Sequence, residues 1–233
     1  MTQQSTRATS LVFIRHAQAA DRDAEGQLLL CGQVDLPLTR RGRLQAEQLR
    51  QAIAGLRSVD ALYTSTLRRA VETSRPLAQQ LALKPKRWPS LREISCGVLD
   101  GMPVTDVKRT YPELWDANLA QADGDFRWPG GESYDGFRKR VLRAVQQIAR
   151  THAGGRVLIV THAGVISQVL GALTGEPAAR WEVFRPAPAT LTEVRWEGRT
   201  GTLVRFNDQY HLSSVNHPDT VRPTAAIARP RAG

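Results

Sequence analysis

The chain has 233 residues, of which 41% are hydrophobic and 23% are charged, as in ordinary globular proteins. No apolar run approaches the roughly 18 residues of a membrane span, and the polar start MTQQSTRATS lacks the apolar segment of a secretory signal, so we expect a cytoplasmic protein without a membrane partner. The net charge of +10 comes from scattered basic residues without interleaved aromatic side chains, which disfavours nucleic acid and favours a small anionic ligand.

The length suits one domain with a sizeable core, and no linker divides the chain. We predict a flexible N-terminal arm over residues 1–10, a single domain over 11–212, and a basic, disordered tail over 213–233. Cys31 and Cys96 are too few for a disulfide scaffold, and their spacing matches no zinc pattern.

The predicted elements alternate between strands and helices, which favours an α/β fold with helices on both faces of the sheet. In the first half of the chain the pattern predicts a strand at 11–14, a loop at 17–38, a helix capped by Thr39, a strand at 61–64, a helix at 67–81 disturbed at Pro76, and a short strand at 86–88. An irregular lid-like segment follows at 102–131. The second half then has a helix after the sequence GGES, a strand at 157–160, a helix at 163–173, and a terminal hairpin at 190–196 and 202–206.

Two of these strands carry the same pattern. The sequences LVFIRHAQ and VLIVTHAG each contain four apolar residues, one polar residue and then His-Ala, with the histidines at positions 16 and 162. Such apolar runs suit buried strands of a parallel sheet, whose carboxyl ends bind ligands in open α/β folds. If the two strands are neighbours, His16 and His162 face one pocket, and Arg15 makes that pocket suitable for an anion.

A second basic feature begins the helix after the strand at 61–64. The sequence STLRRA places Arg68 and Arg69 in the first turn, where free N–H groups and the helix dipole favour anions. Adjacent helical residues point about 100° apart, so only one arginine faces the pocket. The residues themselves leave open which one does.

These groups together suit phosphoryl transfer through a covalent intermediate. A neutral histidine can act as the nucleophile, arginines can hold the phosphoryl oxygens, and a carboxylic acid such as Glu93 can protonate the leaving oxygen. Nearby arginines would keep the nucleophilic histidine unprotonated at neutral pH. No metal-ligand cluster is visible, so we expect neither a metal nor another cofactor.

The ordered motifs resemble those of the histidine phosphatase superfamily, the phosphoglycerate mutase-like proteins, over roughly residues 11–212. They are Arg15-His16-Ala17, Gly32-x-x-Asp35-x-Pro37-Leu38-Thr39-x-x-Gly42, Ser65-x-Leu67-x-Arg69-Ala70, Leu91-x-Glu93, Gly130-Gly131-Glu132-Ser133 and Val160-Thr161-His162-Ala163-Gly164.

By resemblance, the fold is a three-layer α/β/α sandwich whose mostly parallel sheet has an antiparallel edge. The resemblance implies that His16 is the phosphorylated nucleophile, that Arg15, Arg69 and His162 line the phosphate pocket, and that Glu93 is first the proton donor and then the base for water. It implies neither a metal nor a cofactor.

Departures from the family pattern concern the substrate. The family often has an Asn six residues after the histidine, where this chain has Arg22, and we expect Arg22 to contact a second acidic group on the substrate. Gln18 and Ala163 are further predicted substrate contacts. Asp35, Ser65 and His211 are predicted to be structural.

The segment after Glu93 helps to distinguish the possible activities within the superfamily. The resembling mutases have a longer segment with extra basic residues, whereas here 37 positions separate Glu93 from Gly130 and the segment holds Lys108, Arg109 and Arg127. This favours the phosphatase branch, a metal-independent phosphomonoesterase acting on a small phosphorylated metabolite. A cofactor-dependent mutase, or a binding or regulatory protein that kept the fold, stays as the alternative, and a homodimer stays open.

Overall fold

The computed structural model describes residues 7–56 and 58–212. A six-stranded sheet forms the middle layer, in the order β3-β2-β4-β1-β5-β6. Strands β1 to β4 pair with one another in parallel, and β5, antiparallel to both β1 and β6, forms an antiparallel edge with β6. The bounds are β1 Thr9–Arg15, β2 Ala61–Thr64, β3 Lys86–Arg87, β4 Arg156–Thr161, β5 Leu191–Glu197 and β6 Thr200–Asp208.

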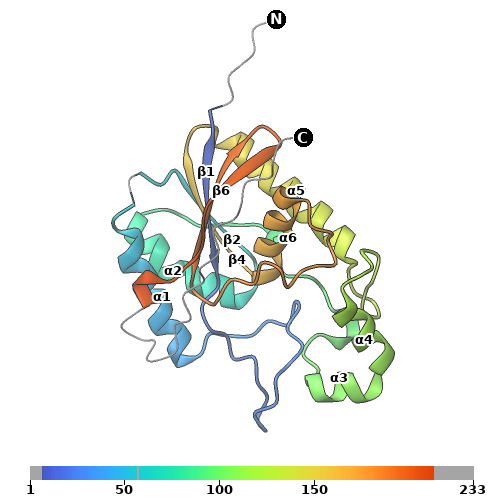
Figure 1. Ribbon diagram of the computed structural model, residues 1–233. Coiled ribbons are helices and arrows are strands. Elements are labelled where there is room, and N and C mark those ends of the chain that lie inside the picture. The colour runs from blue at the N-terminus through green and yellow to red at the C-terminus, as the bar shows by residue number, and fades with distance from the viewer. Residues whose placement is uncertain (1–6, 57, 213–233) are drawn as a thin grey trace, which may run out of the picture.

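Helices cover both faces of this sheet, with α1 and α2 on one side and α5 and α6 on the other (Figure 1). The bounds are α1 Arg40–Ile53, α2 Arg68–Leu81, α3 Val104–Thr110, α4 Pro112–Ala120, α5 Tyr134–Thr151 and α6 Ala163–Thr174, with short 3-10 helices at Pro89–Leu91, Gly97–Leu99 and Tyr210–Leu212. The three-layer sandwich with an antiparallel edge is the predicted fold class, which is thereby confirmed.

Strand β1 shows why the core has two halves. Successive side chains of a strand point to opposite faces. Leu11 and Phe13 pack with α5 and α6, whereas Val12 and Ile14 pack with α1 and α2. All four are fully buried, as expected for a central parallel strand.

Strands β1 and β4 are neighbours, as the repeated His-Ala pattern required. They pair in parallel, with Arg15 opposite Thr161. The residues that follow these two positions are His16 and His162, so both histidines leave the sheet at the same edge. The topology thus brings together two residues that are far apart in the sequence.

Two local predictions need correction. Strand β1 begins at Thr9 rather than Leu11, so Thr9 and Ser10 do not belong to the predicted N-terminal arm. The polar Thr9 can be buried there because its hydroxyl donates a hydrogen bond to the Ala149 carbonyl at 3.0 Å. Helix α2 continues through Pro76. The proline costs the helix one backbone hydrogen bond, and the burial of the neighbouring Leu77 in the core offsets this cost. The predictions for residues 1–6 and 213–233 lie outside the described residues.

The segment 102–131 contains α3 and α4 and packs around its own small core of Val107 and Trp128, with Leu99 beneath. It lies at the side of the molecule next to the loop that follows β1 (Figure 1). Within residues 7–56 and 58–212, none of the helices combines the length and apolar character that crossing a membrane requires.

Candidate active site

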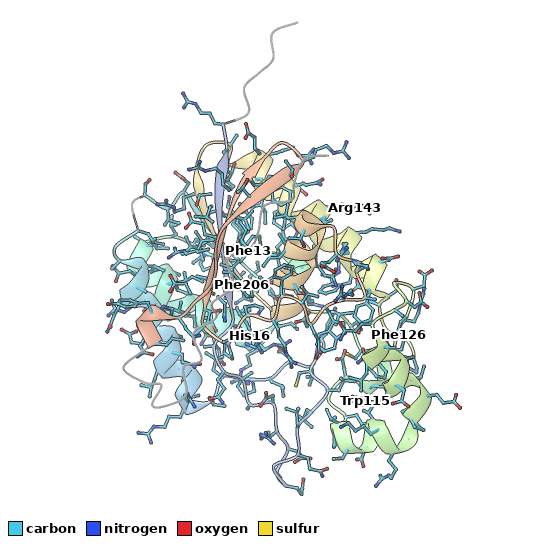
Figure 2. The ribbon with its side chains drawn as sticks, in the orientation of Figure 1. Phe13, His16, Trp115, Phe126, Arg143 and Phe206 are labelled. Carbon is cyan, nitrogen blue, oxygen red and sulfur yellow. The ribbon has the colours of Figure 1, made fainter. Side chains whose placement is uncertain are left out.

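His16 is a buried histidine at the carboxyl end of β1 (Figure 2). Its Nδ1 lies 2.8 Å from the Ala17 carbonyl oxygen. Because a carbonyl only accepts, Nδ1 carries the proton, and the lone pair of the neutral ring is on Nε2. Burial, and then the charges of Arg69 and Arg15, lower the pKa of His16 well below its ordinary value. The predicted direction is confirmed, although burial has a larger effect than the arginines.

His162 is fully buried after β4, and its ring centroid lies 5.1 Å from that of His16. Its Nε2 lies 2.8 Å from the Ser65 hydroxyl, which also accepts the Leu67 N–H at 3.3 Å. The hydroxyl can accept this bond and still donate its proton to Nε2, and that arrangement places the ring proton of neutral His162 on Nδ1. That Nδ1 is buried and has no hydrogen-bond partner. The pKa of His162 is lowered well below its ordinary value, chiefly by burial.

Arg69 is the inward-facing member of the arginine pair. It is almost fully buried and donates to the carbonyls of Val34 and Gly32, each at 2.7 Å. Arg68 is exposed and forms an ion pair with Glu72 at 2.7 Å. The structure therefore agrees with the choice that the family resemblance implied. Asp35 accepts the Arg68 backbone N–H at 2.6 Å, so it caps α2 and has the structural role predicted for it.

Arg15 supplies a second guanidinium, which is half-buried. Its Nη1 donates to the Pro186 carbonyl at 2.7 Å, whereas its Nε is buried without a hydrogen-bond partner. Burial lowers the pKa of Arg15 to about 10, so it remains charged at neutral pH. Arg15 Nε and His162 Nδ1 are thus two buried nitrogen atoms that lack a hydrogen-bond partner.

Glu93 is held by both of its carboxylate oxygens. Oε1 accepts the Ile94 N–H at 3.0 Å, and Oε2 accepts the Gly164 N–H at 2.9 Å. A Cβ at position 164 would lie 2.2 Å from Oε1, so any side chain there would force this carboxylate to move. The motif containing Gly164 was recognised in the sequence, but this contact was not predicted.

Arg140 braces the backbone that carries Glu93, and sequence reasoning missed it. It forms a two-pronged ion pair with Glu132, with Nε to Oε1 at 2.8 Å and Nη2 to Oε2 at 2.7 Å. It also donates to the carbonyls of Ser90, Arg92 and Glu93 at 2.9, 3.1 and 3.3 Å. A single arginine on an amphipathic helix gives no signal of such a role.

The GGES motif divides into two roles. The Ser133 hydroxyl accepts the Gly136 N–H at 3.1 Å and caps α5. Glu132 instead holds Arg140.

The remaining predicted contacts fall in different places. Ala163 lines a cavity beside Arg15 and Glu93. Gln18 accepts hydrogen bonds from the Thr39 side chain at 3.2 Å and joins the loop to α1. Arg22 is exposed, donates to the Gly26 carbonyl at 2.6 Å, and is not among the described residues that line the cavity.

This cavity has a volume of about 430 Å³ and is bordered by Arg15, Glu93 and Gly164. The buried His16, Arg69 and His162 are not among the described residues on its walls. The segment 102–131 forms part of the wall, and Trp115, which Figure 2 labels, is one of its wall residues. The cavity therefore adjoins Arg15 and Glu93, two of the predicted site residues.

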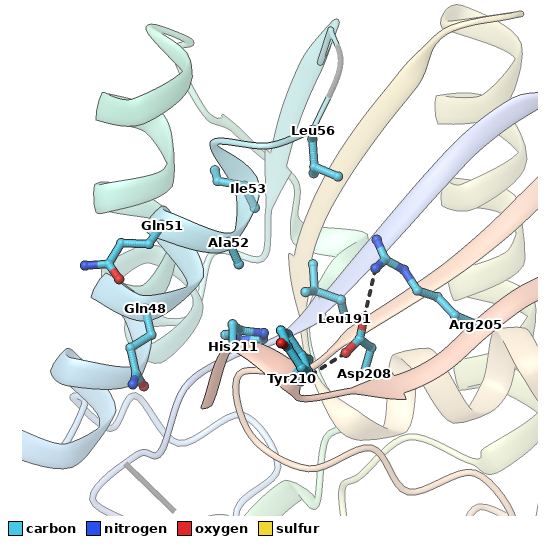
Figure 3. A pocket seen from close by; sticks show the side chains of 10 residues that line it. All are labelled: Gln48, Gln51, Ala52, Ile53, Leu56, Leu191, Arg205, Asp208, Tyr210 and His211. Atoms are coloured by element: carbon cyan, nitrogen blue, oxygen red, sulfur yellow. Dashed lines mark hydrogen bonds and ion pairs between the residues drawn. The ribbon is translucent and has the colours of Figure 1, made fainter. Parts of the chain in front are cut away.

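A second groove of about 410 Å³ lies between α1 and the end of β6 (Figure 3). Its Arg205 and Asp208 form an ion pair at 2.9 Å. His211 donates through Nε2 to the Ala189 carbonyl at 2.9 Å, and the Ala189 N–H in turn donates to the Arg15 carbonyl at 3.1 Å. His211 thus supports the chain beside β1, in agreement with its predicted structural role.

Within the described part of the chain, no three His, Cys, Asp or Glu side chains gather closely enough to hold a metal ion. Cys31 and Cys96 are both free thiols, and burial raises the pKa of Cys31 to about 11.

The model of the histidine phosphatase superfamily (branch 1) matches residues 11–209, and the chain belongs to this family. It is 29% identical over 209 residues to the metal-independent phosphoserine phosphatase of Arabidopsis thaliana, covering 89% of this chain and 84% of that protein.

Two solved structures are similar throughout. YhfR of Bacillus stearothermophilus has a TM-score of 0.80 at 28% identity, covering 88% of this chain and all of that one. A mycobacterial glucosyl-3-phosphoglycerate phosphatase has a TM-score of 0.75 at 26% identity, covering 87% of this chain and all of that one.

Proposed function

We propose that this protein is a metal-independent phosphomonoesterase that forms a phosphohistidine on His16. The observation that carries the proposal is the pair of unpartnered buried nitrogens, Arg15 Nε and His162 Nδ1, beside a nucleophile whose Nε2 lone pair is free. Buried N–H groups without an acceptor are costly, so a site that keeps them gains when an anion binds. A phosphoryl group supplies the acceptor oxygens for them.

In the first step, Nε2 of His16 attacks phosphorus and the bond to the ester oxygen breaks. Protonated Glu93 gives its proton to that oxygen, and the alcohol leaves. Arg15, Arg69 and His162 donate to the nonbridging oxygens, which stabilises the charge of the transition state. The low pKa of His16, caused mainly by burial, keeps the attacking nitrogen unprotonated at neutral pH.

In the second step, ionised Glu93 takes a proton from water, and the resulting hydroxide attacks phosphorus. The N–P bond breaks, inorganic phosphate leaves, and His16 and protonated Glu93 are regenerated. Glu93 can serve in both steps because its carboxylate lines the cavity where the alcohol leaves and water enters.

The test is phosphate release from a panel of phosphorylated metabolites, in the presence of a chelator, by the wild type and His16→Ala. We expect release by the wild type alone, together with a phosphoenzyme whose mass increases by one phosphoryl group. The matched control is His152→Asn, because His152 ends α5 beside the start of β1, at the opposite edge of the sheet.

Full activity in His16→Ala would refute the proposal, as would loss of all wild-type activity on chelation. A bisphosphate-primed transfer assay separates the mutase alternative: transfer without net phosphate release would support the mutase instead.

A further inference from the structure

The cavity beside Arg15 and Glu93 has mainly apolar walls. Three of the segments that form them are far apart in the sequence: the loop after β1, helix α4, and the loop between α6 and β5. Representative side chains from these segments are Leu28 and Leu29, Trp115 and Leu119, and Trp181 and Phe184. The volume of about 430 Å³ is within the usual range of small-molecule sites, roughly 300–1,000 Å³.

Several polar groups on these walls already have partners. The Tyr134 hydroxyl donates to Asn118 Oδ1, so its proton is occupied. The guanidinium of Arg185 lies 3.3 Å from Glu182 and 5.6 Å from the centre of the Trp181 ring. These contacts occupy the polar groups of Tyr134 and Arg185, whereas the Trp181 Nε1 donor on the same wall is buried without a partner.

The charges on the walls also disfavour a second anionic group. Among the described residues that line the cavity, Arg185 is the one cation apart from Arg15, and it is paired with Glu182. Asp21 adds another carboxylate to the wall. A ligand carboxylate in this space would therefore meet at least as much negative as positive charge, because Asp21 and Glu182 balance Arg15 and Arg185 even when Glu93 is protonated.

Two of the wall side chains are large, apolar and open to solvent. Leu28 is 45% exposed on the loop after β1, and Leu119 is 49% exposed on α4. Covering such surface with an apolar ligand is favourable, because apolar area leaves water. A sugar or amino-acid group would gain much less from the same contact.

We infer that the alcohol part of the substrate is an apolar alkyl or aromatic group that occupies this cavity while the phosphate lies at His16. The inference rests on the proposed phosphatase function and specifies its substrate class. It excludes small, doubly charged esters such as phosphoserine as the preferred substrate, because their second charged groups would lie against leucine and tryptophan side chains.

The test is a series of linear alkyl phosphates from ethyl to octyl, which have similar leaving groups and differ in apolar length. We expect kcat/KM to rise by up to about fourfold for each methylene that is fully buried, until the cavity is filled. Hexyl phosphate should exceed phosphoserine in the same assay. A flat or falling series would overturn the inference, even if phosphate release were efficient.

Substitutions locate the effect in this cavity. Leu28→Ser and Leu119→Ser should each lower the ratio of kcat/KM for hexyl phosphate to that for ethyl phosphate. Val98→Ser is the matched control, because Val98 is 70% exposed and lies outside the described cavity lining. An equal fall of the ratio in all three variants would contradict the assignment.

Alkylphosphonates separate this inference from the proposed function, since their P–C bond is not hydrolysed. Calorimetric binding that tightens from ethylphosphonate to hexylphosphonate supports the apolar site independently of catalysis. If phosphonates bind in this manner but no ester releases phosphate, the phosphatase proposal fails and the ligand class stands. If binding is independent of chain length, the ligand class fails.

Discussion

Gly164→Ala separates the position of the Glu93 carboxylate from the stability of the fold. A Cβ at position 164 would lie 2.2 Å from Glu93 Oε1 and 2.9 Å from Cδ, whereas ordinary contacts begin at 3.4 Å. The carboxylate must therefore move by about 1.2 Å, and it risks losing the hydrogen bond from the Gly164 N–H. A misplacement of about 1 Å at a reacting group can cost on the order of 10²-fold in rate.

The expected loss in kcat on alkyl phosphates is thus about 10²-fold, within the 10²- to 10⁴-fold contribution typical of a general acid. Glu93→Gln, which removes the acid, sets the maximum loss. Stability should change little, because alanine is intrinsically better than glycine within a helix by about 1 kcal/mol, and this offsets part of the collision. Thermal melting together with steady-state phosphate release measures both effects.

The leaving group provides a second readout. An aryl phosphate releases a weakly basic phenolate that needs little protonation, so Gly164→Ala should impair phosphoenzyme formation from an aryl ester less than from an alkyl ester. Gly55→Ala is the matched control, because its nearest neighbouring atom is the Ala52 carbonyl oxygen at 4.0 Å. A folded Gly164→Ala protein with wild-type kcat on alkyl phosphates would refute the role assigned to the Glu93 position.

Two further outcomes follow from the histidine environments. Ser65→Ala removes the hydroxyl that bonds His162 Nε2, so kcat/KM should fall about tenfold, which corresponds to the free energy of one hydrogen bond. Unchanged kcat/KM in a folded variant would contradict this. For stability, the folded pKa values of His16 and His162 lie well below about 6.5, so below that pH the unfolded chain binds protons that the native state does not. The free energy of unfolding should be level above about pH 6.5 and fall as pH decreases, by up to about 1.4 kcal/mol per pH unit for each histidine. The free energy of unfolding, measured by urea denaturation, should depend less on pH in the double variant His16→Gln/His162→Gln than in the wild type. The same pH dependence in both proteins would be inconsistent with neutral buried histidines.

The sequence could predict the meeting of His16 and His162 because strong local patterns specify it. Each histidine follows an apolar run that suits a strand buried on both faces, and parallel pairing then places both strand ends at one edge. The helix after Thr39 was predictable for the same reason, since its N-cap hydroxyl and apolar stripe are local. The roles of Ser65 and Arg140 depend on contacts between distant segments, which no local pattern contains.

The loop after β1 shows how such long-range placement alters the interpretation of a substitution. From the sequence, Arg22 was a candidate contact for a second acidic group on the substrate. In the structure Arg22 and Leu28 are bridged across a tight turn, with Arg22 directed to the Gly26 carbonyl and Leu28 on the cavity wall. The loop therefore presents leucine rather than arginine to the space beside Glu93. The predicted Arg22 contact has no geometric support here, and the chemistry of this loop favours an apolar alcohol over a second anion.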